Sequence, residues 1–361
     1  MKTKILFITI LILSTLTLTA QRRVLNMPDI PGYVTLKCDF HSHTVFSDGN
    51  VWPTQRVGEA WRDGLDALAI TDHIEYQPHK KFIPADRNAA WKIAKDVAGD
   101  YNIILVHGAE ITRSMPPGHL NALFIQDADS LDRQDFMQVI EAAVKQGAFI
   151  QYNHPGWTAQ QPDGIPRLYP VHLELIAKGW LHGIEYFNEY ETYRNDTVME
   201  MCRDNKLAVM GNSDIHGVIS ETYMEPEHTH RPVTLVFAKE RTMESLREAM
   251  FAGRTAVWHA DSLAGFEQFT GPLFRAAVKA GVPYKDDGKS IFFEIWNHSD
   301  LPMHLTGGPE GAPANLTLPA NKGIMVKADR RYLSQPLTYD VSNITTGSGT
   351  VLRAEITVPL K

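Results

Sequence analysis

Histidine and carboxylate side chains recur in this chain at the points where short apolar runs stop. Residues 41–73 contain His-Ser-His, Ser-Asp-Gly and Thr-Asp-His, each beside an apolar run. The same residue types return in Asn-His-Pro at 153–155 and in Asp-Ile-His at 214–216. Because residues at the carboxyl ends of the strands of an α/β barrel meet on one face, we expect these side chains to converge. Imidazoles and carboxylates without a thiolate suit zinc, manganese or iron better than calcium or magnesium.

The composition is typical of a globular protein that does not bind polyanions. Of the 361 residues, 43% are hydrophobic and 21% are charged, which is ordinary. The net charge is −7 and no long run of Lys or Arg occurs, so neither a nucleic-acid surface nor a surface for anionic membranes is indicated. The length allows one large domain or two.

The first 20 residues differ from the rest and predict an export signal. Lys2 and Lys4 precede the apolar run Ile5–Leu18. Small residues follow the run, and this order is typical of a secretory signal peptide cleaved near Ala20. The alternative is an uncleaved anchor, for which the run is short. We therefore expect a periplasmic protein whose mature chain has no membrane anchor.

From residue 34 onward, apolar runs alternate with amphipathic segments. The predicted strands are Val34–Phe40, Ala67–Thr71, Ile103–Val106, Leu120–Ile125, Ala148–Tyr152, Gly183–Phe187, Ala208–Gly211 and Val233–Phe237. The predicted helices are Thr54–Asp63, Arg87–Val97, Asp132–Gln146, Pro170–Ala177, Glu191–Asp204 and Thr242–Ala252. This alternation predicts parallel βα units. A closed α/β barrel over residues 21–265 explains ligands at most strand ends better than the alternative, a doubly wound open sheet.

The pattern changes after residue 260. Phe292–Trp296, Ala314–Leu318, Gly323–Ala328 and Leu352–Val358 are predicted strands, separated by turns rich in Gly, Pro and Asn. We expect residues 285–361 to form a small C-terminal β-sandwich domain. The two cysteines, Cys38 and Cys202, show no metal-binding spacing, and we expect two separate buried thiols.

Taken as a set, the motifs resemble the PHP family (polymerase and histidinol phosphatase domain). They occur in the family's order across about residues 34–260, and they are Asp39-Phe40-His41-Ser42-His43-Thr44, Ser47-Asp48-Gly49, Ile70-Thr71-Asp72-His73, Gly108-Ala109-Glu110, Gly118-His119-Leu120, Asn153-His154-Pro155 and Ser213-Asp214-Ile215-His216. A lone His-x-His is weak evidence, whereas the ordered set is specific. The resemblance implies a distorted α/β barrel of the (β/α)7 type that hydrolyses phosphoesters with three metal ions.

The resemblance also implies which residues bind the three ions, expected to be divalent zinc, manganese or iron. One ion would lie among His41, His43, Glu110 and Asp214. Glu110 would bridge this ion to a second one, completed by His119 and His154. Asp48, His73 and His216 would hold the third, and some family members have a histidine where this chain has Asp48. Glu110, Asp214 and His216 are implied to be catalytic.

Other polar residues near these motifs have expected supporting roles. Arg113 and Arg194 follow predicted strand ends, and we expect them to bind the substrate phosphate; the alternative is that each is an ordinary solvated cation. Asp39 and Asp72 adjoin ligands, and we expect them to orient the imidazoles from outside the ligand set.

These expectations combine into a metal-dependent phosphoesterase that hydrolyses small organic phosphate mono- or diesters through hydroxide bound to a trinuclear centre. Two alternatives stay open. A metal hydrolase can instead cleave an amide or a lactone, since a metal hydroxide also attacks carbonyl groups. The chain can also be a non-catalytic binding protein with a vestigial site. We expect a small phosphorylated substrate rather than a nucleic-acid polymer as the partner.

The predicted signal peptide leads to a direct test. We predict that the natively expressed protein begins near Gln21 and appears in the periplasmic fraction of a Gram-negative host, because a short apolar run favours cleavage over anchoring. N-terminal sequencing of the purified protein measures this. An intact Met1 on protein from the soluble cytoplasm would contradict export.

Overall fold

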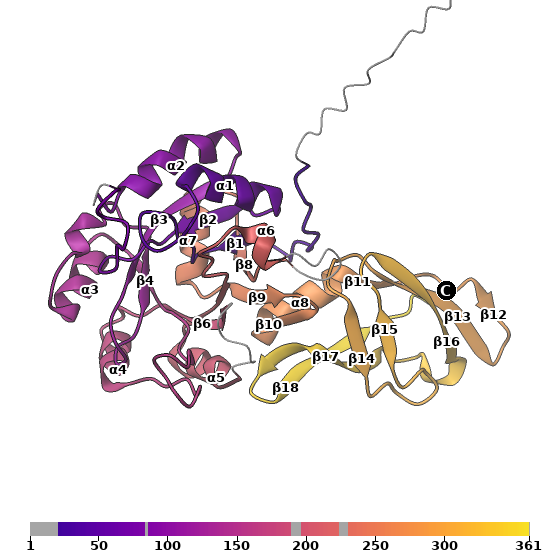
Figure 1. Ribbon diagram of the computed structural model, residues 1–361. Helices are drawn as coiled ribbons and strands as arrows, with labels where there is room; N and C mark the ends of the chain where they lie inside the picture. The colour runs from indigo at the N-terminus through magenta and orange to yellow at the C-terminus, as the bar shows by residue number, and fades with distance from the viewer. Residues whose placement is uncertain (1–20, 84–85, 189–195, 224–229, 361) are drawn as a thin grey trace, which may run out of the picture.

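The computed structural model describes residues 21–83, 86–188, 196–223 and 230–360, so the predicted signal peptide lies outside the described residues. Figure 1 shows an elongated molecule with two regions. One, called here the α/β region, spans residues 34–265 and contains most of the helices. The other, called here the β-rich region, spans residues 278–358 and is built almost entirely of strands.

Eight strands of the α/β region lie side by side in the order β8-β1-β2-β3-β4-β5-β6-β7. Their bounds are β1 (Val34–Asp39), β2 (Ala67–Ile70), β3 (Ile104–Ile111), β4 (Leu120–Leu123), β5 (Phe149–Tyr152), β6 (Gly183–Asn188), β7 (Ala208–Asn212) and β8 (Val233–Ala238). All eight strands predicted from the sequence are present. Most of their residues are buried, which is why they read as continuous apolar runs.

The strands are not all parallel, which differs from the expectation of uniform βα units. β1, β2 and β3 run parallel, as do β5, β6 and β7. In contrast, β4 is antiparallel to both β3 and β5, and β8 is antiparallel to β1. The reason is the short connection 112–119 between β3 and β4, which contains no helix. A parallel return needs a crossover of a dozen or more residues, so this chain segment can only return antiparallel.

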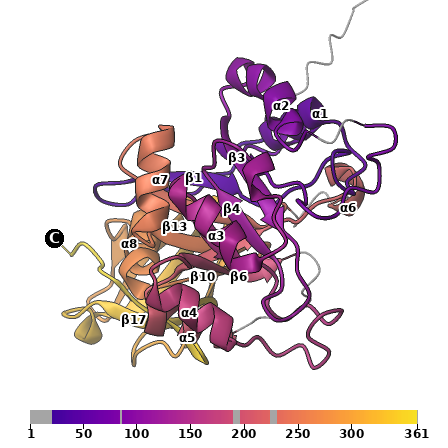
Figure 2. The same cartoon turned by 90° about the vertical axis from the view of Figure 1, so that its left-hand side faces the viewer.

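The helices surround the strands, as the end-on view of the α/β region shows (Figure 2). They are α1 (Pro53–Arg62), α2 (Ala89–Asp100), α3 (Phe136–Lys145), α4 (Pro170–Ala177), α5 (Asp196–Asn205), α6 (Ile219–Thr222) and α7 (Met243–Phe251), with α8 (Glu267–Ala277) leading into the β-rich region. The helix predicted from Asp132 begins only at Phe136. The Asp135 side chain accepts a hydrogen bond from Gln138 N and so caps this helix in place of Asp132.

The sheet curls until its two distant ends meet. The backbone N–H of Asp214, just after β7, donates to the carbonyl of His41, just after β1, at 2.9 Å. The N–H of His43 donates to the carbonyl of Ile215 at 3.0 Å. The Thr234 hydroxyl of β8 also accepts a hydrogen bond from Gly211 N of β7. These contacts bring the chain segments that follow β1 and β7 to one place.

The β-rich region continues the same sheet and adds a second one. Parallel pairing of β10 (Ser262–Gly265) with β17 (Leu337–Gly347) joins the two regions, and β9 (Thr255–His259) connects β10 to β8. The remaining strands of the first sheet are β14 (Met303–Thr306), β15 (Leu316–Leu318) and β18 (Thr350–Ile356). The second sheet contains β11 (Val278–Ala280), β12 (Lys285–Asp286), β13 (Ser290–Asn297) and β16 (Lys322–Asp329). A β-rich C-terminal region is present, and its description as a sandwich stays a prediction.

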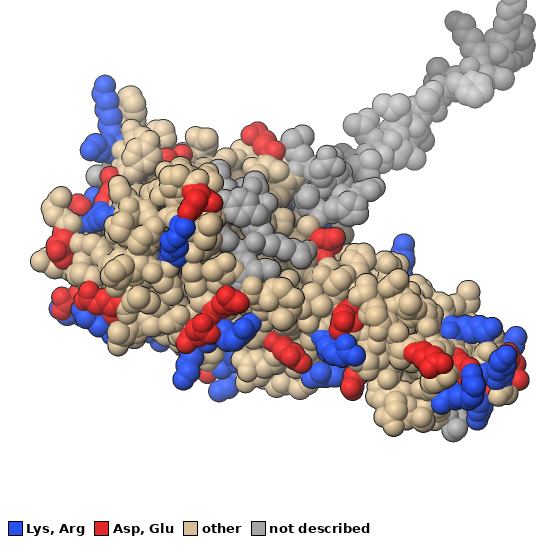
Figure 3. All heavy atoms as spheres, turned by 90° about the horizontal axis from the view of Figure 1, so that it is seen from below, with Lys and Arg blue, Asp and Glu red and all other residues tan. Residues whose placement is uncertain are grey.

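Burial accounts for the expectations about cysteine and for the core. Cys38 and Cys202 are both free and buried, as predicted. Phe293 of β13 and Tyr339 of β17 belong to one hydrophobic cluster, so the two sheets of the β-rich region share a core. Within the described residues, no helix combines the length and apolar character needed to cross a membrane. Figure 3 shows acidic and basic side chains intermixed over one face of the molecule.

The curled sheet leads to a prediction about Gly211 of β7. A Cβ atom at this position would run into the side chain of Val257 on β9. We predict that Gly211→Ala lowers the free energy of unfolding by about 1–3 kcal/mol, the usual cost of overpacking a core. Urea unfolding measures the change.

Two variants serve as controls for the Gly211 prediction. Adding Val257→Ala should recover part of the loss, because it removes the side chain in conflict. Gly99→Ala in α2, where a Cβ would meet nothing within 4 Å, should not destabilise the protein. Wild-type stability of Gly211→Ala would contradict the close packing of β7 on β9.

Candidate metal centre

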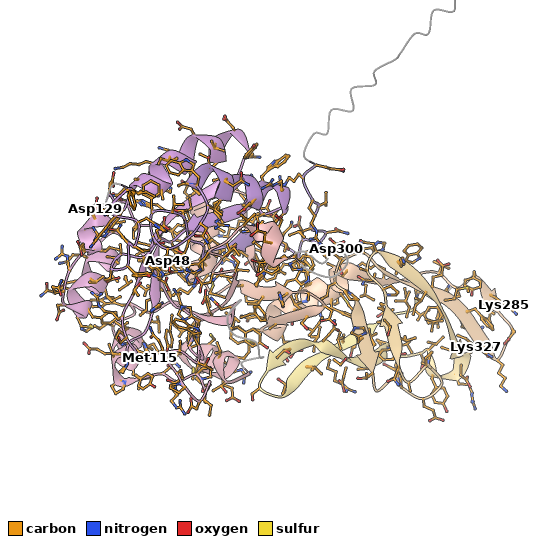
Figure 4. All side chains as sticks on the ribbon, in the orientation of Figure 1. Asp48, Met115, Asp129, Lys285, Asp300 and Lys327 are labelled. Atoms are coloured by element: carbon orange, nitrogen blue, oxygen red, sulfur yellow. The ribbon has the colours of Figure 1, made fainter. Side chains whose placement is uncertain are left out.

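The ends of five neighbouring strands carry the residues predicted to bind metal. His41 and His43 follow β1, His73 follows β2, and Glu110 lies within β3. The remaining ligands are His119 directly before β4, His154 after β5, Asp214 and His216 after β7, and Asp48 in the loop between β1 and α1. Figure 4 places Asp48 inside the α/β region, far from Lys285 and Lys327 at the end of the β-rich region. The structure thus brings all nine predicted ligands together.

Glu110 stands at the centre of this group. Its Oε1 lies 3.4 Å from His41 Nε2, 3.1 Å from His119 Nδ1 and 3.5 Å from His154 Nε2. Its Oε2 lies 2.8 Å from His73 Nδ1 and 3.5 Å from His43 Nε2. Only 1% of the Glu110 residue is exposed. A carboxylate in contact with five imidazoles has the geometry expected of a bridging ligand.

Two further carboxylates complete the site. Asp214 Oδ1 lies 3.1 Å from His41 Nε2 and 2.9 Å from His43 Nε2. Asp48 lies on the opposite side, with its Oδ1 3.2 Å from His216 Nε2 and its Oδ2 3.5 Å from His73 Nε2. Potential ligand atoms gather within 4.8 Å of one another in three groups, which are His43, Asp48, His73 and His216; His41, His43 and Glu110; and His73, Glu110 and His119.

Several buried polar atoms of the site make no hydrogen bond. These are His41 Nε2, His43 Nε2, Asp48 Oδ1, Glu110 Oε2 and Asp214 Oδ1. Buried polar atoms are almost always paired because leaving them unsatisfied costs free energy. Cations placed between these imidazole nitrogens and carboxylate oxygens would satisfy them. The residues therefore fit divalent metal ions, and their N/O composition suits transition metals.

The charges of the site control its protonation. Burial raises the pKa of Glu110, but the neighbouring His73, His41 and His119 lower it more, so the pKa lies well below its usual value. Burial lowers the pKa of His73, yet Glu110 and Asp48 raise it to about 10. Without an ion, the protein therefore keeps its central carboxylate ionised and a proton on His73.

Most of the imidazoles are held through Nδ1, which leaves Nε2 for an ion. His41 Nδ1 contacts the Glu185 carboxylate at 2.9 Å, and His43 Nδ1 contacts the Ser47 hydroxyl at 3.3 Å. His216 Nδ1 donates to the carbonyl of Asp214 at 2.7 Å. A metal-binding histidine usually has such a partner on its second nitrogen, because the partner fixes its tautomer and its orientation.

Asp39 and Asp72 support the ligands less directly than expected. Asp72 accepts hydrogen bonds from Thr44 N and from the Ser47 hydroxyl, both at 2.7 Å, so it acts on His43 through Ser47. Asp39 accepts hydrogen bonds from Ser213 N, the Ser213 hydroxyl and Arg231 rather than from an imidazole. Both residues hold the backbone on which ligands stand, and neither touches a histidine ring.

Sequence reasoning missed two buried residues of the site. Glu185 in β6 is the direct partner of His41. Arg56 in α1 is fully buried and donates to the carbonyls of His43 and Gly217, which fixes the loops on both sides of the centre. The signal for Glu185 was visible in the sequence, because it is a carboxylate in the middle of the predicted buried strand Gly183–Phe187. Arg56 gave no comparable signal within its amphipathic helix.

A cavity of about 460 Å³ opens onto the centre. Its lining consists of Asp48, His73, Tyr76, Glu110, Thr112, His119, His154, Trp157, Asp214 and His216. Among the described residues, no Lys or Arg belongs to this lining. The guanidinium of Arg113 instead pairs with Glu75 and donates to the carbonyl of Arg133 at 2.8 Å. The structure places Arg113 beside the cavity rather than in its lining, and Arg194 lies outside the described residues, so both phosphate-binding roles stay predictions.

Comparisons with known proteins agree with the fold and the site. The PHP domain family matches residues 39–155. A solved structure from Bacteroides vulgatus, described as a two-domain protein containing a predicted PHP-like metal-dependent phosphoesterase, has 37% sequence identity and a TM-score of 0.89, covering 94% of this chain and 99% of that one. An uncharacterized protein of Methanocaldococcus jannaschii is 38% identical over 84 residues, which are 23% of this chain and 36% of that protein's length. The chain belongs to the PHP family and has the fold of a PHP-like metal-dependent phosphoesterase.

The central position of Glu110 leads to a prediction about metal occupancy. The purified wild-type protein should carry close to three transition-metal ions after metal supplementation. Glu110→Gln keeps the size of the side chain but removes its charge, so it should lower the metal content and reduce turnover by orders of magnitude. Elemental analysis and activity assays measure the two effects. Wild-type metal content in Glu110→Gln would exclude it as a bridging ligand.

The raised pKa of His73 leads to a prediction about pH. Because this imidazole keeps its proton below a pKa of about 10, an ion that binds to it must displace that proton. Metal binding should therefore release protons, and the apparent affinity should rise as the pH increases from about 6 to about 8. Titration calorimetry in buffers of different ionisation enthalpy measures the number of protons released. Proton-neutral binding would contradict ligation by His73.

Proposed function

We propose that the protein is a metal-dependent phosphoesterase that hydrolyses small organic phosphate mono- or diesters. The observation that carries the proposal is the contact of Glu110 with five imidazoles at the base of an open cavity. Membership in the PHP family supports a phosphoester over other substrates of metal hydrolases. In this proposal, zinc, manganese or iron occupies three positions of the α/β region, which acts as a distorted (β/α)7 barrel.

The nine ligands divide the work of holding these ions. Glu110 would lie between the ion held by His41, His43 and Asp214 and the ion held by His119 and His154. Asp48, His73 and His216 would hold the third. Ions bound there would supply an activated water and would stabilise the negative charge of the phosphoryl group during in-line displacement. The carboxylates reduce the mutual repulsion of the cations, and their low pKa values keep them ionised at neutral pH.

The cavity suggests how the substrate is arranged. Tyr76 and Trp157 belong to its lining, and the Trp157 ring lies 5.2 Å from that of His154 and 5.8 Å from that of His119. Aromatic side chains at these positions can contact the organic part of a substrate whose phosphate is directed at the ligand cluster. We further infer that the substrate is met outside the cytoplasm, because the first 20 residues have the sequence pattern of an export signal.

A substrate panel tests this proposal against the alternatives. The metal-reconstituted protein is assayed on phosphate monoesters, phosphate diesters, carboxylic esters, lactones and amides, with Asp48→Asn as the matched inactive control. We expect turnover of phosphate esters that is lost in Asp48→Asn. Turnover only of carboxylic substrates would favour the second class of metal hydrolase. Tight ion binding without turnover of any class would favour a non-catalytic binding protein.

A further inference from the structure

A buried carboxylate of β6 lies behind the metal centre. Glu185 is 0% exposed and belongs to none of the three groups of potential metal ligands. Its Oε1 accepts hydrogen bonds from His41 Nδ1 at 2.9 Å, Asn212 Nδ2 at 2.9 Å and Gln151 Nε2 at 3.0 Å. Its Oε2 accepts one from the backbone N–H of His154 at 2.8 Å and one from Asn188 Nδ2 at 3.1 Å.

Such an arrangement is costly unless it has a function. An ionised carboxylate away from water is stable only when it is hydrogen-bonded and when its charge is compensated. Within the described part of the chain, the ion-pair partner of Glu185 is His41, and the other four donors are neutral amides. Compensation of the charge must therefore pass through the His41 ring to the centre beyond it.

We propose that Glu185 is a positioning residue for the metal centre, which fixes the His41 tautomer that directs an Nε2 lone pair at an ion and holds the backbone of His154. The inference rests on the proposed function only in requiring that the centre binds metal ions. It adds a residue outside the nine ligands on which their arrangement depends.

The two nitrogens of His41 explain this role. Because the carboxylate can only accept, Nδ1 carries the proton that bonds to Glu185. On the other side of the ring, Nε2 lies 3.1 Å from Asp214 Oδ1 and 3.4 Å from Glu110 Oε1, and it makes no hydrogen bond. A lone pair directed at two carboxylates is repelled by them unless a cation lies between. The tautomer that Glu185 selects is therefore the one that binds metal.

The second contact of Glu185 acts on the backbone of another ligand. His154 has a φ of 27°, in the left-handed region that non-glycine residues rarely adopt. Its N–H donates to Glu185 Oε2, and its Nε2 lies 3.5 Å from Glu110 Oε1. The hydrogen bond thus helps to hold an unfavourable backbone conformation that directs the imidazole into the site. One carboxylate on β6 thereby links ligands that follow β1 and β5.

Glu185→Gln is the informative substitution. The amide keeps the shape of the side chain but offers one acceptor oxygen and one donor group to five converging donors. At least one donor then faces an NH2 group, and His41 loses the charged acceptor that fixes its tautomer. We expect one ion per chain to bind on the order of 10–100-fold more weakly, as is usual when the partner of a metal-binding histidine is removed, while the other ions keep their affinity.

The experiment uses Zn²⁺ as the probe. Competition with a chromophoric chelator gives the affinities of wild-type, Glu185→Gln, His41→Gln and the double variant, and thermal unfolding is measured with and without Zn²⁺. If Glu185 acts through His41, then adding Glu185→Gln to His41→Gln should weaken binding little further. Phe293→Leu, in the buried core of the β-rich region, is the control for lost stability and should leave every Zn²⁺ affinity unchanged.

The outcomes separate the two proposals. Selective weakening of one ion in Glu185→Gln, with a smaller Zn²⁺-induced rise of Tm, supports positioning. Wild-type affinities in Glu185→Gln overturn it, as does an equal fall of Tm with and without Zn²⁺ that leaves the affinities unchanged. Additive losses in the double variant also overturn it, since Glu185 would then not act through His41. A wild-type protein that binds no Zn²⁺ contradicts the proposed function itself.

Discussion

The carboxylate of Glu110 is the interaction on which the rest of the structure depends. It is buried at the middle of the sheet, on β3, and five imidazoles from other chain segments approach within 3.5 Å of it. An ionised group in such a place is stable only if positive charge or donors surround it. The curl of the sheet brings the residues after β1 and β7 to β3, and backbone bonds such as Asp214 N to His41 O close this arrangement. The fold and the charge therefore stabilise each other.

The direction of β4 explains how the sequence pattern extends to His119. Parallel strands place residues that follow them on the shared edge, as with His73 after β2 and His154 after β5. Because β4 runs antiparallel, the residue on that edge is the one before the strand, and His119 directly precedes Leu120. A rule based on the ends of apolar runs therefore fails for His119. Its assignment came from the ordered motifs of the resemblance, and the structure places its Nδ1 at 3.1 Å from Glu110.

The sequence predicted the ligands well and their supports poorly, for a physical reason. The ligands are polar residues next to strands, so their residue types and spacing are visible along the chain. Their supports are defined by contacts across the sheet, such as Glu185 of β6 with His41 after β1, and no local pattern encodes such pairs. The same limit applies to strand direction, which depended on a connection too short for a crossover. Arg113 lies at a strand end, yet Glu75 occupies its guanidinium, a contact that spacing does not reveal.

Charge balance explains how a site without basic residues in its described lining can attract a phosphate. Asp48, Glu110, Asp214 and Glu185 contribute four negative charges if all are ionised. Three divalent ions would contribute six positive charges, and with neutral imidazoles the surplus is two. That surplus suits the binding of an anionic substrate and an activated water without an arginine clamp. Glu185 lowers the surplus from behind, where it cannot meet the substrate, so its charge favours retention of the cations without repelling the phosphate directly.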